Sequence, residues 1–250
     1  MVKGVSIKFQ SYQETLPKLL KAIGFDKEIK RHERIILKPN LMDGVEGGST
    51  KAEFVDKVLG FVMSNKNPGT EVYIAEGCDG FDTEDIFDEF GYRALSEKYG
   101  VGLIDLNNTD TEFVENDEFL RFEGIHFPKI MEGSFVVSLP YLKRDEELSV
   151  SGALVNMLGA FPASHYKGFF SKGKSKIKKW PLKYAVHDIL KCKMPEFTII
   201  DASDKGHILA GRPLDMDKQA VKSMGLDWKE IPYLRLIDES FENRDKNKSE

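Results

Sequence analysis

The sequence predicts an α/β fold: a mainly parallel β-sheet with helices on both faces. Two observations indicate it. Apolar strand patterns alternate with helical patterns along the chain, which is typical of parallel sheets. Two of the strand patterns, residues 34–38 and 134–142, are continuous apolar runs, as expected of strands buried on both faces. Since no linker separates two cores, we expect a single α/β domain at residues 1–238 and a disordered charged tail at 239–250.

The amino-terminal part predicts alternating elements. Residues 5–9 alternate as a strand, and a helix over 11–24 begins at the cap Ser11 and stops at Gly24. Residues 51–64 have apolar positions at helical spacing. The further predicted elements are strands at 34–38, 70–77 and 101–106 and one or two helices over 82–100.

The carboxyl-terminal part contains a different kind of segment. Short alternating pieces at 107–130 predict a small antiparallel β addition. The elements expected after it are a strand at 134–142, a helix at 149–161, a Lys- and Gly-rich loop at 164–180, a helix at 181–192, a strand at 196–203 and a helix at 215–225.

Composition limits the classes of function. The formal net charge of -5 does not favour nucleic acid or an anionic membrane as a partner. Cys78 and Cys192 lack metal-ligand spacing, so we expect no iron–sulfur cluster and no structural zinc from this chain alone. The first residues read as a strand rather than a signal peptide, and apolar runs are shorter than the roughly 18 residues of a membrane span. These features predict a cytoplasmic location without membrane insertion.

Polar residues follow several predicted strands, where α/β proteins bind ligands. Glu76 and Asp201 are candidates for proton transfer. With Asp105 they could supply carboxylates to a divalent cation, although no spacing identifies a metal. The alternative is that these strand ends are polar because they meet solvent. The strand-end residues considered are Lys38, Asn40, Glu76, Asp105, Ser138, Lys143 and Asp201.

The loop that follows Lys38 is a candidate anion site. Glycines 44, 47 and 48 permit close backbone approach, and Ser49 or Thr50 can cap the helix that follows. A capped helix amino terminus beside Lys38 favours a phosphate or carboxylate ligand. The alternative is an ordinary strand-to-helix connection with a Ser cap, since no Walker sequence occurs.

A second helix start offers further ligand contacts. Ser149 and Ser151 lie near the start of the predicted helix at 149–161, and Lys143 precedes them. Asn156 lies in an otherwise apolar stretch, so it is either a ligand contact or a satisfied structural amide.

The basic loop carries the remaining candidates. His165 is the histidine best placed for acid–base chemistry or metal binding, because it lies in a loop. Lysines interleaved with aromatic residues over 166–183 could hold single-stranded nucleic acid or a phosphorylated ligand. The alternative is a solvated loop, which the acidic overall charge supports.

Several stretches in order resemble the family catalogued as domain of unknown function 362. They are "ILKPNLMDG…GST", "VYIAEG", "GYRALSEKYGVGLIDLN", "VVSLPYLK", "SGALVNMLG" and "TIIDAS", with "RPLDMDKQAVKSMGLDWKEIPYLRL" at the end. The resemblance covers roughly residues 33–237. It implies an α/β architecture and poorly defined biochemistry, and some members carry ferredoxin-type cysteine modules.

This chain departs from the family pattern at several positions. Val155 replaces a common lysine, Arg212 replaces the first aspartate of an Asp-Pro pair, and the segment after Asp201 is shortened. We also expect no ferredoxin module, because the two cysteines lack the spacing of cluster ligands.

We therefore expect a small-molecule enzyme or ligand-binding protein with an anion site at the strand carboxyl ends. Its cofactor is unknown, and a divalent cation is compatible with the site. The first alternative is a non-catalytic accessory protein with a redox or other protein partner, and the second is a nucleic-acid binder through 166–183. The predicted catalytic residues are His165, Glu76 and Asp201; the predicted ligand contacts are Lys38, Asn40, Ser49, Thr50, Lys143, Ser151 and Asn156.

Overall fold

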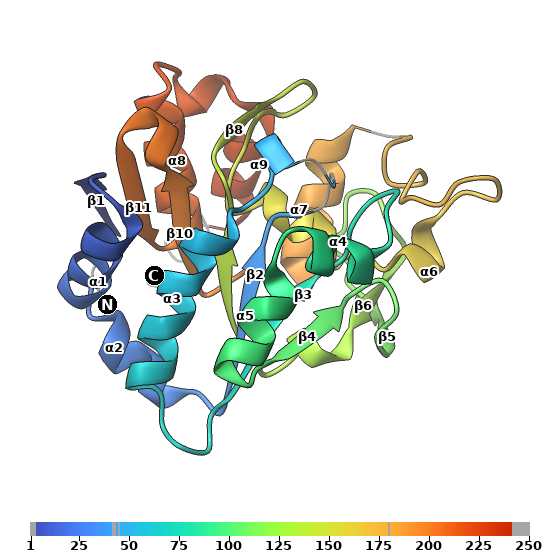
Figure 1. Ribbon diagram of the computed structural model, residues 1–250. Coiled ribbons are helices and arrows are strands. Elements are labelled where there is room, and N and C mark those ends of the chain that lie inside the picture. The colour runs from blue at the N-terminus through green and yellow to red at the C-terminus, as the bar shows by residue number, and fades with distance from the viewer. Residues whose placement is uncertain (1–3, 42–43, 45, 180, 242–250) are drawn as a thin grey trace, which may run out of the picture.

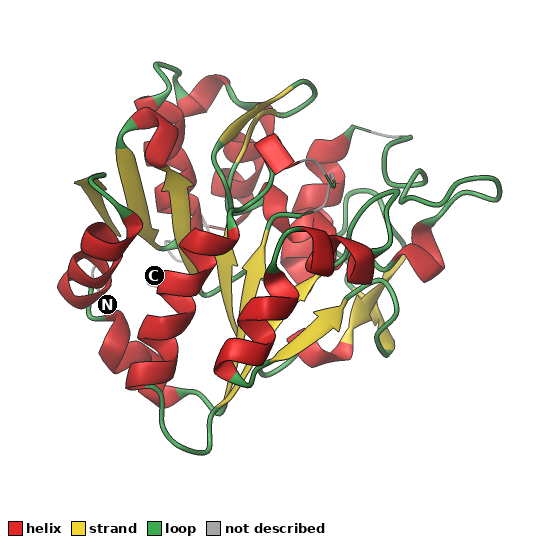
Figure 2. Cartoon of the chain, in the orientation of Figure 1, coloured by secondary structure: helices red, strands yellow, loops and turns green. Residues whose placement is uncertain are grey.

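The computed structural model describes residues 4–41, 44, 46–179 and 181–241. A twisted sheet runs through the molecule with helices on both sides (Figures 1 and 2). The predicted tail at 239–250 lies mostly outside the described residues, but its first three residues, 239–241, belong to a helix.

The main sheet has seven strands in the order β1-β11-β10-β7-β2-β3-β4. The pairs from β10 to β4 are parallel, and β11 pairs antiparallel with both β10 and β1, so the sheet is mainly parallel as predicted. The strands are β1 (Gly4–Lys8), β2 (Arg34–Pro39), β3 (Glu71–Glu76), β4 (Gly102–Asp105), β7 (Phe135–Leu139), β10 (Phe197–Ala202) and β11 (His207–Gly211).

Two small antiparallel sheets lie outside the main sheet. The first pairs β5 (Thr111–Glu115) with β6 (Gly124–Pro128), which confirms the β addition predicted at 107–130. The second pairs β8 (Lys143–Asp145) with β9 (Ser149–Ser151).

The helices fall into two groups that pack on opposite faces of the sheet (Figure 1). The first group is α1 (Tyr12–Ala22), α2 (Phe25–Glu28), α3 (Ala52–Asn65), α4 (Thr83–Glu89) and α5 (Tyr92–Tyr99). The second group is α7 (Leu182–Cys192), α8 (Pro213–Ser223) and α9 (Pro232–Phe241). The short α6 (Ala163–Tyr166) and the 3₁₀ helices η1 (Ile29–Arg31), η2 (Glu46–Gly48), η3 (Lys129–Met131), η4 (Val155–Ala160), η5 (Ser203–Lys205) and η6 (Trp228–Glu230) complete the elements.

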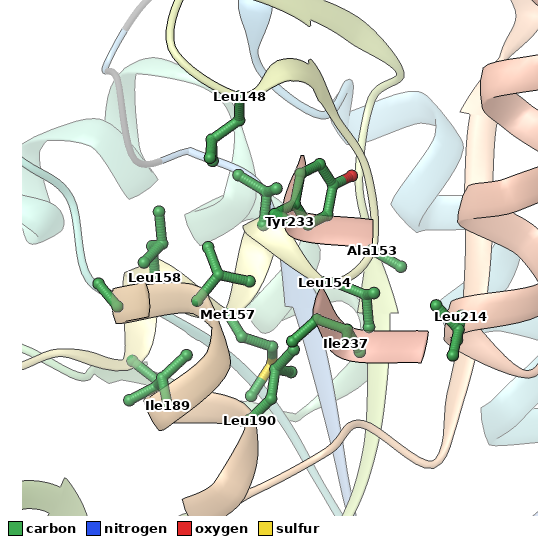
Figure 3. Packing of buried hydrophobic residues seen from close by; sticks show 14 of the residues in the cluster. Leu148, Ala153, Leu154, Met157, Leu158, Ile189, Leu190, Leu214, Tyr233 and Ile237 are labelled. Carbon is green, nitrogen blue, oxygen red and sulfur yellow. The ribbon is translucent and has the colours of Figure 1, made fainter. Parts of the chain in front are cut away.

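The strands of the main sheet contribute residues to two hydrophobic cores, one on each face of the sheet. Neighbouring residues along a strand belong to different cores. In β2, Ile35 and Leu37 belong to the cluster under α1 and α3, whereas Ile36 belongs to the cluster under α7, α8 and α9. Successive strand residues point to opposite faces, so a strand covered on both faces needs apolar residues at every position. Figure 3 shows the second core, where Met157 and Leu158 of η4 pack near Ile189 and Leu190 of α7.

The helix predicted at 149–161 is wrong. Ser149–Ser151 form strand β9, and Val155–Ala160 form the 3₁₀ helix η4. The backbone N–H groups of Ala153 and Leu154 donate to the carboxylate of Asp217, at 2.7 and 3.0 Å. A partner that is distant in sequence therefore satisfies donors that an α-helix starting at Ser149 would have used.

Other local predictions were confirmed in part. Ser11 caps α1 as predicted, accepting from the N–H of Glu14. The helix predicted at 51–64 is α3, but its cap residue is Lys51, and neither Ser49 nor Thr50 caps it. Strand β11 and helix α9 were not predicted: β11 follows the αL residue Gly206, and α9 buries Tyr233, Leu234 and Ile237.

Candidate functional site

The chain reverses its direction of winding across the sheet between β2 and β7. From β2 it proceeds through β3 to β4, and it then returns to place β7 on the other side of β2. In open α/β sheets, ligands bind beyond the carboxyl ends of the strands at such a switch point. Lys38 of β2 and Ser138 of β7 lie opposite each other there.

Lys38 and Glu76 form a buried ion pair at this edge. The Lys38 Nζ lies 2.8 Å from the Glu76 Oε1, and both side chains are 0% exposed. The carboxylate also accepts from the N–H groups of Leu41 and Gly77, at 2.9 and 2.8 Å. These contacts satisfy both charged groups within the protein, so an external anion would need a rearrangement to reach the Lys38 ammonium.

Asn156 closes the crevice over this pair. Its side-chain oxygen accepts from the Lys38 Nζ at 3.1 Å, and its NH₂ donates to the Lys38 carbonyl and to the Ser138 hydroxyl. A Cβ placed on Gly159 would lie 2.0 Å from the Glu76 Oε1 and 2.6 Å from the Lys38 Nζ. The η4 backbone therefore lies directly on the ion pair, and the Asn156 amide is a satisfied structural group.

The glycine-rich loop is closed at its base by Asn40 and Thr50. The Thr50 N–H donates to the Asn40 carbonyl, and the Asn40 N–H donates to the Thr50 Oγ1, each at 2.9 Å. The Thr50 hydroxyl in turn donates to the Leu139 carbonyl of β7. These bonds fix the loop to both strands of the switch point.

Ser49 is the exception in this loop. Its side chain is buried, with the residue 4% exposed, yet its hydroxyl has no hydrogen-bond partner among the described residues. The Lys143 Nζ lies close by, 3.2 Å from the position that a Cβ on Gly48 would occupy. A buried hydroxyl without a partner carries a free-energy cost of about 1–3 kcal/mol, which a bound ligand would relieve.

Ser151 and Asp201 lie at the margins of this arrangement. Ser151 is buried in β9 opposite Lys143 of β8. Asp201 is fully buried and accepts from the Tyr12 hydroxyl at 2.7 Å and from the Ser203 N–H at 3.0 Å. Asp201 therefore links the end of β10 to α1, on the face of the sheet that α1 and α3 cover.

His165 belongs to a different part of the molecule. It is exposed on α6, and its ring stacks on that of His126 in β6, with centroids 3.8 Å apart. Its Nε2 lies 3.4 Å from the Thr111 Oγ1. Partial burial, and then the charge of His126, lower the pKa of His165. The described contacts of His165 include none of the other predicted site residues.

Lys174 is a buried site residue that the sequence did not single out. It is 2% exposed, and its Nζ donates to the carbonyls of Gly77 at 2.6 Å and Gly159 at 3.0 Å. Burial lowers the pKa of Lys174 to about 8; Glu76 opposes the shift and Lys38 adds to it. In sequence it is one of many lysines of the basic loop, and no local pattern separates it from its exposed neighbours.

An open pocket of about 530 Å³ lies beside this edge, at the carboxyl end of β4. Asp105 and Asn107 line it, with Ser164 and Lys167 from the segment around α6. Asn107 itself is held by three hydrogen bonds, to Cys78, Thr83 and Ala163. At this edge of the sheet, buried polar side chains contact one another, and an open polar pocket lies beside them.

The described residues offer neither a cluster of metal ligands nor a membrane-spanning helix. No group of three or more His, Cys, Asp and Glu residues in the described part of the chain could hold a metal ion. Within the same residues, no helix is long and apolar enough to cross a membrane. Cys78 is a buried thiol whose pKa is raised to about 12 by burial, with Glu76 adding to the effect.

The fold and its strand-end polar cluster define an α/β protein with a switch-point site. The model of the family described as domain of unknown function (DUF362) matches residues 35–220, so the chain belongs to this family. This confirms the resemblance inferred from the sequence. No curated protein matches the chain.

One similar solved structure is the lactate racemase apoprotein from Thermoanaerobacterium thermosaccharolyticum. The TM-score is 0.59 at 14% sequence identity, and the similarity covers 92% of this chain and 58% of that protein. The present chain thus matches little more than half of the racemase apoprotein. At this identity the similarity shows a shared fold.

Proposed function

We propose that the protein binds a small anionic molecule, a carboxylate or a phosphate, at the carboxyl ends of β2 and β7. The observation that carries the proposal is the buried Ser49 hydroxyl, which has no partner among the described residues. It lies in the same loop as Gly48, against which the Lys143 ammonium is placed. A hydroxyl donor and a cation together suit an anionic oxygen.

The start of α3 supports the same ligand class. No side chain caps this helix, so its first N–H groups are not satisfied by a capping side chain. The helix dipole places partial positive charge at this end, two residues after Ser49. An anion held by Ser49 and Lys143 would therefore also be stabilised by α3.

The other predicted contacts take supporting roles in this proposal. Asn40 and Thr50 hold the loop base, while Lys38 and Asn156 fill the crevice behind it. Glu76 and Asp201 remain proposals as proton-transfer groups, and each would have to exchange a present hydrogen-bond partner for the ligand. His165 would act only through a ligand that also reaches the α6 region.

Isothermal titration calorimetry with inorganic phosphate and with L-lactate tests the proposal. Lactate is included because the similar fold belongs to a lactate racemase apoprotein. We expect Ser49→Ala and Lys143→Met each to weaken binding by roughly tenfold, the effect of losing one charge-assisted hydrogen bond. Ser64→Ala and Lys21→Met are the matched controls on exposed parts of helices, and they should bind as the wild type does.

Two outcomes would contradict this function. If the wild type and the Ser49→Ala and Lys143→Met variants bind with equal affinity, the proposed binding site is ruled out. Absence of heat with both probes and with sulfate would favour the alternative of a non-catalytic accessory protein with a protein partner.

A second candidate function rests on the basic loop. Phe169 and Phe170 are 96% and 98% exposed, and Lys167 and Lys172 flank them. Exposed aromatic rings among lysines favour single-stranded nucleic acid, although Lys174 is buried and Lys178 pairs with Asp79. Binding to single-stranded RNA that weakens steeply with salt and is lost in Phe169→Ala/Phe170→Ala would support this function.

A further inference from the structure

Lys174 is a buried amine that the proposed anion site does not use. It belongs to the loop between α6 and α7 and reaches inward to the end of β3, where it lies against Gly77 and Gly159. A Cβ on Gly77 would lie 3.1 Å from the Lys174 Nζ and 2.6 Å from the Gly159 carbonyl oxygen. The lack of a side chain at Gly77 therefore makes room for this amine.

Glu76 and Asp79 favour the charged form of Lys174, but each forms its ion pair with another lysine. Among the described residues, no carboxylate lies within ion-pair distance of its Nζ. Glu76, the nearest influence that favours the charged form, is already paired with Lys38. Burial is the main cause of the lowered pKa of Lys174, and the neighbouring Lys38 ammonium adds to it, so the neutral form of Lys174 is accessible near neutral pH.

The two hydrogen bonds of Lys174 are compatible with a neutral amine. An NH₂ group has two hydrogens, and the Gly77 and Gly159 carbonyls accept two hydrogen bonds. Loss of the third proton therefore breaks neither bond and leaves a lone pair on nitrogen. A desolvated amine beside another cation is the environment that activates lysine as a nucleophile.

A small apolar pocket adjoins the Lys174 side chain. Its volume is about 30 Å³, and Lys174 lines it together with Leu158, Ile177, Leu182 and the charged residues Asp79 and Lys178. This is room for about two water molecules, so only a compound of a few atoms fits without movement of the loop. At its margin Lys178 is paired with Asp79 at 2.7 Å.

From this geometry we propose that Lys174 forms a Schiff base with the carbonyl group of a very small aldehyde or 2-oxo acid. The Nζ lone pair adds to the carbonyl carbon, and a proton moves from nitrogen to the former carbonyl oxygen. The C–O bond then breaks, the hydroxyl leaves as water together with the second proton of the nitrogen, and a C=N bond joins the compound to Lys174. No oxidant or reductant is needed, and the step stands independently of the anion site at Ser49.

The other charged groups around Lys174 set the conditions for this reaction. Lys38 from β2 and Glu76 from β3 face it from the sheet, and Cys78 and Asp79 follow β3. Asp79 accepts from the Lys174 N–H and pairs with Lys178 at 2.7 Å, so it holds the loop in place. Within this set, Lys174 lines the pocket and, in its neutral form, has a nucleophilic nitrogen, whereas Asp79 lines the pocket as the ion-pair partner of Lys178.

Trapping of the imine in the full chain tests the proposal. The protein is incubated at pH 8 with glyoxylate, and separately with pyruvate, in the presence of cyanoborohydride, and labelled lysines are located by peptide mass spectrometry. The neutral fraction of Lys174 at this pH is roughly a hundredfold larger than that of an ordinary lysine. Burial offsets part of this advantage, so we expect Lys174 to be labelled roughly tenfold faster than Lys172 or Lys176.

Two controls keep the test decisive. Lys174→Arg retains the positive charge but cannot form an imine, so the fast labelling should disappear while the circular dichroism spectrum is kept. In urea, Lys174 should be labelled at the rate of Lys172. Labelling of native Lys174 no faster than Lys172, or fast labelling that persists in Lys174→Arg, overturns the proposal.

Discussion

Lys38 and Lys174 are both buried lysines at the same edge of the sheet, but their surroundings differ. Lys38, at the end of β2, has a carboxylate at 2.8 Å. Lys174, in the loop after α6, has two backbone carbonyls. The first arrangement compensates the ammonium charge with a carboxylate, whereas the second provides only neutral hydrogen-bond acceptors. The comparison shows that burial alone does not decide the role of a lysine; the partner does.

The largest effect is expected where the ion pair is broken. Lys38→Met leaves the Glu76 carboxylate buried with two N–H donors but without its ion-pair partner, which should lower the free energy of unfolding by about 3–5 kcal/mol. Urea denaturation measures it. Lys21→Met removes an ion pair whose lysine side chain is 62% exposed and should change stability by less than about 0.5 kcal/mol. Equal losses in the two variants would contradict the structural role of Lys38.

The next effect concerns the close approach of η4 to the ion pair. Gly159→Ala places a methyl group 2.0 Å from the Glu76 Oε1, which requires η4 to move. We expect a loss of about 1–3 kcal/mol in urea denaturation, as for overpacked cores. Gly47→Ala is the matched control, because nothing lies within 4 Å of its added Cβ. A Gly159→Ala variant as stable as Gly47→Ala would show that η4 packs less closely on the Lys38–Glu76 ion pair than these distances indicate.

The pH dependence of stability distinguishes the two lysines further. Burial lowers the pKa of Lys174 to about 8 from an ordinary value of 10.5, so charging it destabilises the folded state. This destabilisation is fully present below pH 8 and is lost as the pH rises from 8 to 10.5. The free energy of unfolding of the wild type should therefore rise relative to that of Lys174→Met, by up to about 1.4 kcal/mol per pH unit. Parallel curves would contradict the lowered pKa.

The smallest effect is expected at His165, which is exposed. Partial burial and His126 lower the pKa of His165, so its protonation destabilises the stacked pair. The destabilisation is present at low pH and disappears as the pH rises past the ordinary histidine pKa of about 6.5. His165→Gln should therefore lose less stability than the wild type on acidification, and NMR titration of the ring should show the shift directly. A His165 ring that titrates above the ordinary histidine pKa of about 6.5 would contradict this.

Much of the fold could be predicted because its signals are local. The continuous apolar run of β7 and the alternating run of β1 are visible in any short window of the sequence. The segment 149–161 could not be predicted in this way, because it has helical spacing but gives its N–H groups to Asp217. The carboxylate that decides the backbone there lies more than 60 residues away in the chain.

The candidate site, like the fold, could be predicted from the sequence only in part. Lys38, Glu76 and Lys143 were predicted because strand ends of a parallel sheet meet at one edge, and Ser49 because it follows a glycine-rich loop at a predicted helix start. Sequence could not show that Glu76 already neutralises Lys38, or that Ser49 is left without a partner. Both facts depend on distances between side chains of different strands and loops.

The sequence by itself determined the α/β class, the family and the edge of the sheet where polar residues gather, since these depend on periodicity and order along the chain. Only the tertiary structure separated the two lysines, because the charge on a lysine depends on what surrounds its nitrogen. A carboxylate contacts Lys38, whereas two glycine carbonyls and a small pocket surround Lys174. These partners come from segments far apart in the chain, and folding alone brings them together.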